Sequence, residues 1–159
     1  TKKGKTKPIL VPVDFSNSSE SALLCAAELA DALGSELVVL HVVHDPGEAP
    51  GYYAVKGRNK QMRRMEDVAA EMLEEFLQTL RKKHPGHAAI QHASTMLVVG
   101  LPVNRILESA EKIQARMIIM GSQGRTGLAH AMLGSKSVHV VRLSSVTVLI
   151  VKYKKPEKS

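Results

Sequence analysis

The chain has 159 residues, enough for one domain with a substantial core and too few for two comfortable ones. Its 44% apolar and 23% charged residues are typical of a globular protein. No run of about 18 apolar residues predicts a membrane span, and no basic start followed by an apolar stretch predicts a secretory signal. The lone cysteine, Cys25, is expected to act as a small buried hydrophobe. We expect a cytoplasmic protein.

The net charge of +7 is concentrated at the two ends of the chain. Residues 1–7 hold four lysines, and residues 152–159 hold four more against one glutamate. The part between them holds 14 basic and 14 acidic residues. We therefore expect basic flexible tails at 1–7 and 153–159 around one domain at 8–152. Nucleic acid is not expected as the main ligand, beyond weak contact through the tails, because tryptophan is absent and aromatic residues are few.

The first third of the chain predicts strand, helix and strand. Residues 8–13 are apolar and β-rich. Asn17 and Glu20 have the spacing of a capping box, and Gly34 is a candidate C-cap for the helix between them. Residues 36–43 are almost continuously apolar, which is typical of a strand buried on both faces of a parallel sheet.

The middle of the chain predicts a loop at 44–58 and a long helix at 59–83. The helix has an apolar stripe rich in methionine, which we interpret as core rather than as a partner groove. After a break at Pro85-Gly86, residues 89–99 predict a third strand, and Pro102 opens the next helix.

The last part of the chain predicts a strand at 116–120, a loop at 121–134, a helix at 135–143 and a strand at 146–151. Strands and helices thus alternate along the chain. This order predicts an α/β Rossmann-like fold with a single doubly wound, five-stranded parallel sheet and helices on both faces. Such sheets bind ligands at the carboxyl ends of their strands, where the strand order reverses.

One segment after the fourth strand suits a phosphate group. It offers glycines, hydroxyls and cations at Gly121, Gly124, Arg125, Gly134, Ser135, Lys136 and Ser137. The first two glycines allow a sharp turn and close approach to a ligand. The last glycine and the two serines open a helix, whose free N–H groups and dipole favour an anion.

Other phosphate and metal motifs do not fit. A P-loop would need glycine and then lysine where the chain has Ala129 and Ser135. A dinucleotide fingerprint would need glycines directly after the first strand, where none occur. His41 and His44 could suggest a metal pair, but no carboxylate or cysteine stands at ligand spacing, so no metal site is predicted.

The pattern Gly-x2-Gly-x9-Gly-Ser begins at Gly121, and the first strand ends in Val13-Asp14. Together with the element order, this resembles the universal stress protein family over about residues 7–152. The resemblance implies a fold like that of the adenine nucleotide alpha hydrolases. Members that keep the glycine pattern bind ATP, so the resemblance implies an ATP-binding chain, with Mg²⁺ held by the phosphates.

The resemblance also implies roles for single residues. Asp14 would contact the ribose or adenine, and the backbone of Val42 would pair with the adenine edge. Pro12 and Val13 would line the adenosine pocket. The remaining expected nucleotide-binding residues lie around the ribose and phosphates: Met120, Gly121, Gly124, Arg125, Gly134, Ser135, Lys136 and Ser137.

Two features of the resemblance need comment. Many relatives have Gly-Asp/Asn-Pro where this chain has Gly100-Leu101-Pro102, so no role is assigned to that turn. Relatives often form homodimers through the last strand, and Val146–Val151 would be a suitable exposed edge. Alternatively, this segment is simply an apolar strand before the lysine-rich tail.

The sequence favours an ATP-binding module that acts as a nucleotide-dependent switch in stress response or signalling. Two other functions stay open: a scaffold that binds protein partners without nucleotide, and a slow ATPase. No convincing catalytic set accompanies the glycine segment, so at most slow hydrolysis is expected. Plain structural roles also stay open, since Asp14 and Ser135 could each merely cap a helix.

Overall fold

The computed structural model describes residues 6–44, 65–123 and 133–153. Five parallel strands form one sheet in the order β3-β2-β1-β4-β5. The strands are β1 (Ile9–Pro12), β2 (Leu37–Val43), β3 (Ser94–Val99), β4 (Met117–Gly121) and β5 (Thr147–Val151). The helices are α1 (Asn17–Leu33), α3 (Met65–Lys83), α4 (Ala88–Gln91), α5 (Pro102–Lys112) and α6 (Ser135–Leu143). The predicted doubly wound parallel sheet is confirmed.

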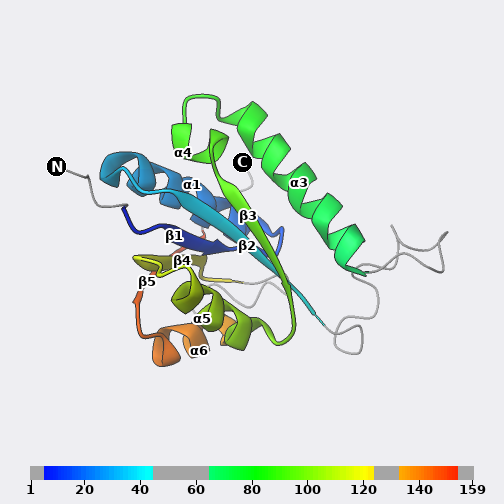
Figure 1. Cartoon of the computed structure of the whole chain (residues 1–159), viewed down its shortest axis with the longest axis vertical. Coiled ribbons are helices and arrows are strands. Elements are labelled where there is room, and N and C mark those ends of the chain that lie inside the picture. Colours follow the sequence, from blue (N-terminus) through cyan, green and yellow to red (C-terminus); the bar gives the residue numbers. More distant parts are fainter. Residues whose placement is uncertain (1–5, 45–64, 124–132, 154–159) are drawn as a thin grey trace, which may run out of the picture.

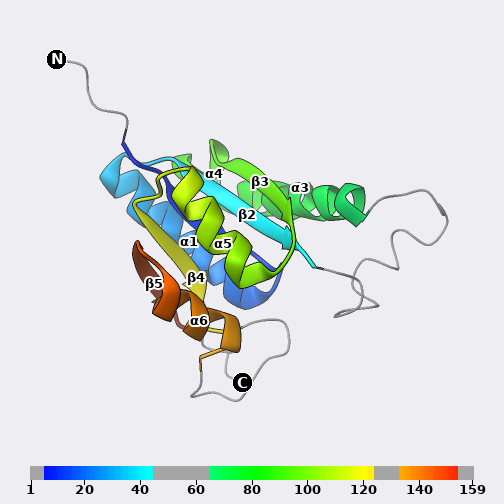
Figure 2. The same cartoon turned by 60° about the horizontal axis from the view of Figure 1, so that its bottom comes forward.

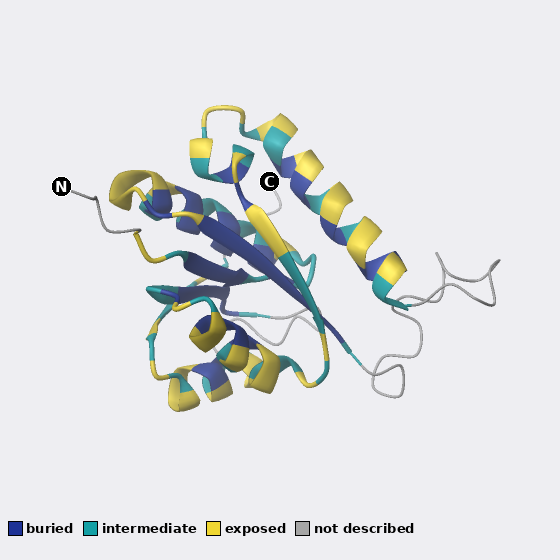
Figure 3. Ribbon diagram, in the orientation of Figure 1, coloured by how far each residue is buried: buried dark blue, intermediate teal, exposed yellow. Residues whose placement is uncertain are grey.

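Helices cover both faces of the sheet, with α1, α3 and α4 on one face and α5 and α6 on the other (Figure 1). Every residue of β2 is buried, as expected for an inner parallel strand (Figure 3). Its alternate side chains enter the two cores: Leu37 and Val39 pack with α1, and Val38 and Leu40 pack with α5. No helix in the described ranges is long and apolar enough to cross a lipid bilayer.

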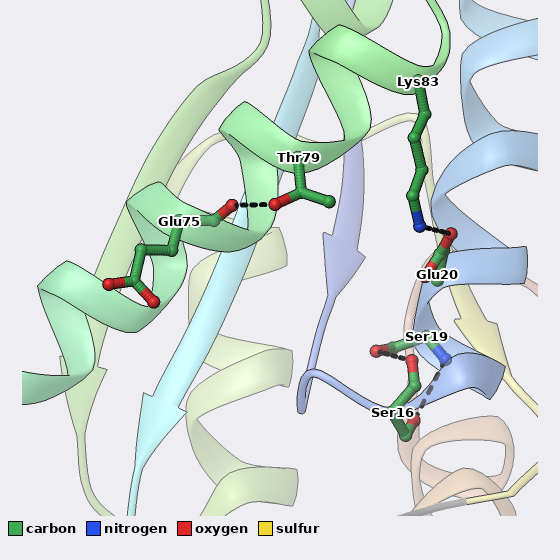
Figure 4. A network of polar contacts seen from close by, with 6 residues as sticks. All are labelled: Ser16, Ser19, Glu20, Glu75, Thr79 and Lys83. Atoms are coloured by element: carbon green, nitrogen blue, oxygen red, sulfur yellow. Dashed lines mark hydrogen bonds and ion pairs between the residues drawn. The ribbon is translucent and has the colours of Figure 1, made fainter. Parts of the chain in front are cut away.

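Helix α1 begins one residue earlier than the predicted capping box. Ser16 is the N-cap, and its Oγ accepts a hydrogen bond from the Ser19 N–H at 3.1 Å (Figure 4). Glu20 does not reach back to the cap; its carboxylate lies 3.8 Å from Lys83 Nζ at the end of α3. The predicted C-cap is confirmed, since Gly34 is left-handed at φ 63°.

The expected strand at 89–99 is wrong in its first half. Residues 88–91 form the short helix α4, and β3 begins only at Ser94. Long-range contacts stabilise this turn against its strand-like sequence. Asp31 Oδ1 accepts the Ala89 N–H at 2.9 Å, and the Arg81 guanidinium donates to the carbonyls of Ile90 and Ala93.

The other element bounds agree with the predictions to within one or two residues. Pro102 is the first residue of α5, as expected. Helix α3 is described from Met65, so the predicted start of the helix at 59 lies outside the described residues, as does nearly all of the 44–58 loop. The middle of the 121–134 loop is likewise outside them.

Candidate functional site

The strand order reverses between β1 and β4, and Figure 2 shows helices α1 and α6 near β4. The Gln123 N–H donates to Ser18 Oγ at 3.2 Å and so links the end of β4 to the start of α1. The Ser137 hydroxyl donates to the Gly121 carbonyl at 2.9 Å and links the same strand end to α6. The carboxyl edge of the sheet is therefore built from β1, β4 and the amino ends of two helices.

The turn after β1 carries the predicted residue Asp14. Its Oδ1 accepts the Ser16 N–H at 3.0 Å, while the cap of α1 is supplied by Ser16 itself. Asp14 is half-buried. Pro12 ends β1, and the Val13 N–H donates to the Leu40 carbonyl at 2.8 Å, so both lie where the sequence placed them. The carboxylate thus stands at the reversal point without being the helix cap.

Val42 lies beside this turn, near the end of β2. The register between β1 and β2 ends at Pro12 and Leu40. Because the Leu40 carbonyl faces β1 and residues alternate along a strand, the N–H and C=O of Val42 also face β1's side, past the end of that strand. Its side chain is buried on the α5 face. The backbone of Val42 therefore lies at the carboxyl edge of the sheet, beyond the last paired residue of β1.

The predicted phosphate-binding residues Gly134, Ser135, Lys136 and Ser137 lie at the amino end of α6. Gly134 is its N-cap and has no side chain to satisfy the first N–H groups of the helix. Ser135 and Lys136 are exposed, and Ser137 is buried. Since the hydroxyl proton of Ser137 is already donated to Gly121, Ser137 has its backbone N–H left for an anion.

Gly121 stands where β4, α1 and α6 converge. A Cβ at this position would lie 2.8 Å from the Ser18 carbonyl oxygen and still closer to Ser18 Oγ. Only glycine lets β4 approach α1 this closely. Met120 precedes it and is buried in the core with α5, 7% exposed. The predicted residues Gly124 and Arg125 lie outside the described residues.

Sequence reasoning missed two residues of this edge. Ser18 is 3% exposed and joins α1 to the end of β4; nothing in its sequence context marks it. His41 was considered only as a metal ligand, but its Nδ1 lies 2.8 Å from the Val13 carbonyl oxygen. Burial lowers the pKa of His41. The sequence signal that could have identified His41 is a polar residue inside the apolar run of β2.

Cys25 is half-buried in α1. Desolvation, with a smaller effect of the Glu28 charge, raises the pKa of its thiol. The thiol is therefore protonated at neutral pH and is a poor nucleophile.

The fold defines an α/β protein of the Rossmann-like class, with a helix N-terminus beside the point where the strand order reverses. The chain belongs to the universal stress protein family, whose model matches residues 5–152. It is 32% identical to universal stress protein MJ0577 of Methanocaldococcus jannaschii over 157 residues, which covers 93% of this chain and 96% of that protein. It is 33% identical to YxiE of Bacillus subtilis over 91% of this chain and 97% of that one.

Solved structures show the same fold. The structure of MJ0577 superposes with a TM-score of 0.71 at 29% identity and covers 95% of this chain and 99% of that one. A universal stress protein in complex with cAMP matches with a TM-score of 0.66 at 23% identity, covering 92% and 97% of the two chains. A universal stress protein of Archaeoglobus fulgidus in complex with dAMP matches with a TM-score of 0.65 at 23% identity, covering 93% of this chain and 99% of that one.

Proposed function

We propose that this chain binds an adenine nucleotide, with ATP as the preferred ligand, at the crevice between β1 and β4. The observation that carries the proposal is the amino end of α6. Beside the reversal point of the sheet, its glycine cap supplies no side chain, and no side chain in the described ranges caps its first N–H groups. Free N–H groups and the positive end of the helix dipole together favour a phosphate.

The phosphates would lie against Gly134, Ser135, Lys136 and the N–H of Ser137. Lys136 is exposed in the first turn, where its ammonium can approach a phosphate oxygen. Gly124 and Arg125 complete the predicted set from the segment before α6. A magnesium ion would be held mainly by the phosphates themselves, as is usual for this ion.

The nucleoside would lie across the ends of β1 and β2. Asp14 offers a carboxylate oxygen to a ribose hydroxyl, and the backbone of Val42 offers one donor and one acceptor to the adenine edge. Pro12, Val13 and Met120 supply apolar surface nearby, and Gly121 permits close approach. The relatives solved with cAMP and dAMP support an adenine nucleotide as the ligand class, because both ligands are adenine nucleotides bound to proteins of the same fold.

Within the cell, we propose a switch in stress response or signalling, in which the bound nucleotide orders the surface that a partner protein recognises.

A homodimer through β5 would present two such sites. β5 is an edge strand with one side paired to β4. The single free cysteine supports a reducing compartment, the cytoplasm.

Calorimetric titration with ATP, ADP and AMP, with and without Mg²⁺, tests the proposal. We expect ATP to bind most tightly and Lys136→Gln to weaken ATP more than AMP, because it removes a charge from the phosphate end. Lys112→Gln, at the end of α5, is the matched control and should leave every affinity unchanged. Absence of binding at millimolar ATP would refute nucleotide binding and favour a nucleotide-independent scaffold.

A further inference from the structure

His41 is a buried imidazole on an otherwise aliphatic strand. It is 1% exposed, and its side chain lies on the same face of β2 as Val39 and Val43. A polar group buried to this extent requires a hydrogen bond to offset its lost hydration. The proposed phosphate site makes no use of this imidazole. The role of His41 is therefore inferred from the group to which its ring is hydrogen-bonded.

The partner is the turn that carries Asp14. His41 Nδ1 lies 2.8 Å from the Val13 carbonyl oxygen, and both atoms are buried. Because a carbonyl only accepts, Nδ1 must carry the hydrogen, and this fixes the tautomer. The His41 side chain on β2 thereby orients the Val13 carbonyl, at the point where the regular pairing of β1 with β2 stops.

The ring of Phe15 packs on the same imidazole. The two centroids are 4.4 Å apart, and the rings are inclined by 30°. Phe15 has φ 66°, a left-handed conformation that is costly for a bulky residue and persists only where its surroundings enforce it. The Phe15 ring also packs edge-on against the ring of Phe76 in α3, with the centroids 5.6 Å apart. The turn is therefore held by contacts with both β2 and α3.

Asp14 lies between these two fixed residues. Val13, which precedes it, is hydrogen-bonded to His41 through its carbonyl, and Phe15, which follows it, packs on the His41 ring. The Asp14 carboxylate itself accepts the Ser16 N–H at 3.0 Å. The orientation of Asp14 is therefore set by the residues on either side of it as well as by its own bond to Ser16.

Within the described ranges, the charged or titratable side chains that act on His41 are those of Asp14, His44 and Lys136. Asp14 follows β1, His44 follows β2 and Lys136 belongs to the first turn of α6. Lys136 and His44 oppose protonation of the imidazole, and Asp14 favours it, while burial is the largest effect and opposes it. A neutral imidazole with hydrogen on Nδ1 is the form that suits this position.

We infer that His41 is the positioning residue of the nucleoside half of the site: through the Val13 carbonyl and the Phe15 ring it holds Asp14 in the orientation that binds the ribose hydroxyls of an adenine nucleotide. This inference rests on the proposed function. His41 itself need not touch the nucleotide, because it acts through the turn.

The test compares three variants of the whole chain. His41→Leu keeps bulk and removes the donor. His41→Asn can place an amide N–H where Nδ1 stands. Val39→Ala, on the same strand and face, removes buried volume but leaves the hydrogen bond between His41 and Val13 in place. Each is measured for amide hydrogen exchange at Ser16 without nucleotide, for ATP affinity by calorimetry and for unfolding midpoint in urea.

For His41→Leu we expect both Ser16 exchange to accelerate and ATP affinity to fall by about tenfold, the effect of losing one well-placed buried hydrogen bond. His41→Asn should recover most of both. Val39→Ala should lower the unfolding midpoint while leaving both other readouts near wild type. Unchanged Ser16 exchange in His41→Leu, or equal effects of Val39→Ala, would overturn the inference.

If His41→Leu does not fold, His41→Asn against His41→Gln keeps the inference testable, because the longer glutamine cannot place its amide at the Nδ1 position. Asn should then bind ATP more tightly than Gln, and the reverse order contradicts the inference. Failure of the wild-type protein to bind any adenine nucleotide would instead refute the proposed function. Ser16 exchange in the nucleotide-free protein would still decide whether His41 holds the turn.

Discussion

The hydroxyl of Ser137 donates a hydrogen bond to the carbonyl oxygen of Gly121 at 2.9 Å, with both groups buried. One residue ends β4 and the other lies in the first turn of α6, so this bond joins the two ends of the segment between them. It fixes the amino end of α6 against the sheet. The anion-binding end of the helix therefore has a defined distance from the strand that leads into it.

Ser137→Ala should destabilise the fold by about 1–3 kcal/mol, because it leaves the buried Gly121 carbonyl without its donor. Ser135→Ala, two residues earlier and exposed, should change the unfolding free energy by less than about 0.5 kcal/mol. Urea unfolding followed by circular dichroism gives both values. Equal stability of the two variants would mean that the buried bond contributes nothing.

Gly121→Ala should cost about 1–3 kcal/mol of stability, since its Cβ would overlap the backbone of Ser18 and push α1 away from β4. Nucleotide affinity should fall as well, because the crevice widens. Gly86→Ala is the control: no atom lies within 4 Å of the added Cβ, and the position is exposed. A wild-type melting temperature for Gly121→Ala would show that α1 moves aside freely.

Acidification should destabilise the protein through His41. Its folded pKa is lowered, by burial first, so the unfolded chain takes up a proton more readily than the folded one. The contribution is fully present above the ordinary histidine value of about 6.5 and is lost as pH falls from there through the lower folded pKa, by at most about 1.4 kcal/mol per pH unit. Urea midpoints between pH 7.5 and pH 5 should fall more steeply for wild type than for His41→Asn. Parallel curves would contradict the assignment.

The proposed homodimer predicts a specific effect on the outer edge of β5. The Val151 carbonyl accepts from Ser122, so alternate residues such as Ile150 direct their N–H away from β4. Ile150→Pro removes that outward donor and should convert a dimer into a monomer. Ile150→Ala, which also loses the side chain but keeps the N–H, should stay dimeric. Sedimentation velocity distinguishes the two, and a monomeric wild type would refute the dimer.

Much of the fold was predictable because its signals are local. The burial of β2 on both faces follows from its unbroken apolar run, and Gly34 marks the end of α1 because only glycine adopts that conformation cheaply. Pro102 at the start of α5 is of the same kind. Each of these features depends on a few neighbouring residues.

The errors concern long-range contacts. Helix α4 replaces the first half of a predicted strand because Asp31 and Arg81, from two other helices, bind its backbone. The N-cap of α1 is Ser16 and not the predicted Asn17, because the spacing between Asn17 and Glu20 does not by itself determine where the first turn of the helix begins. For the site, the glycines and serines could be found from the sequence, whereas the role of His41 depends on which carbonyl its ring meets across two strands.

Strand β1 pairs with β4 as well as with β2, and Ile9 lies opposite Met117, over a hundred residues further along the chain. During synthesis the edge of β1 that pairs with β4 must therefore stay unpaired until β4 has left the ribosome. The crevice between β1 and β4 comes into being only at that late closure. A ligand bound there would stabilise the completed molecule and none of its truncated precursors.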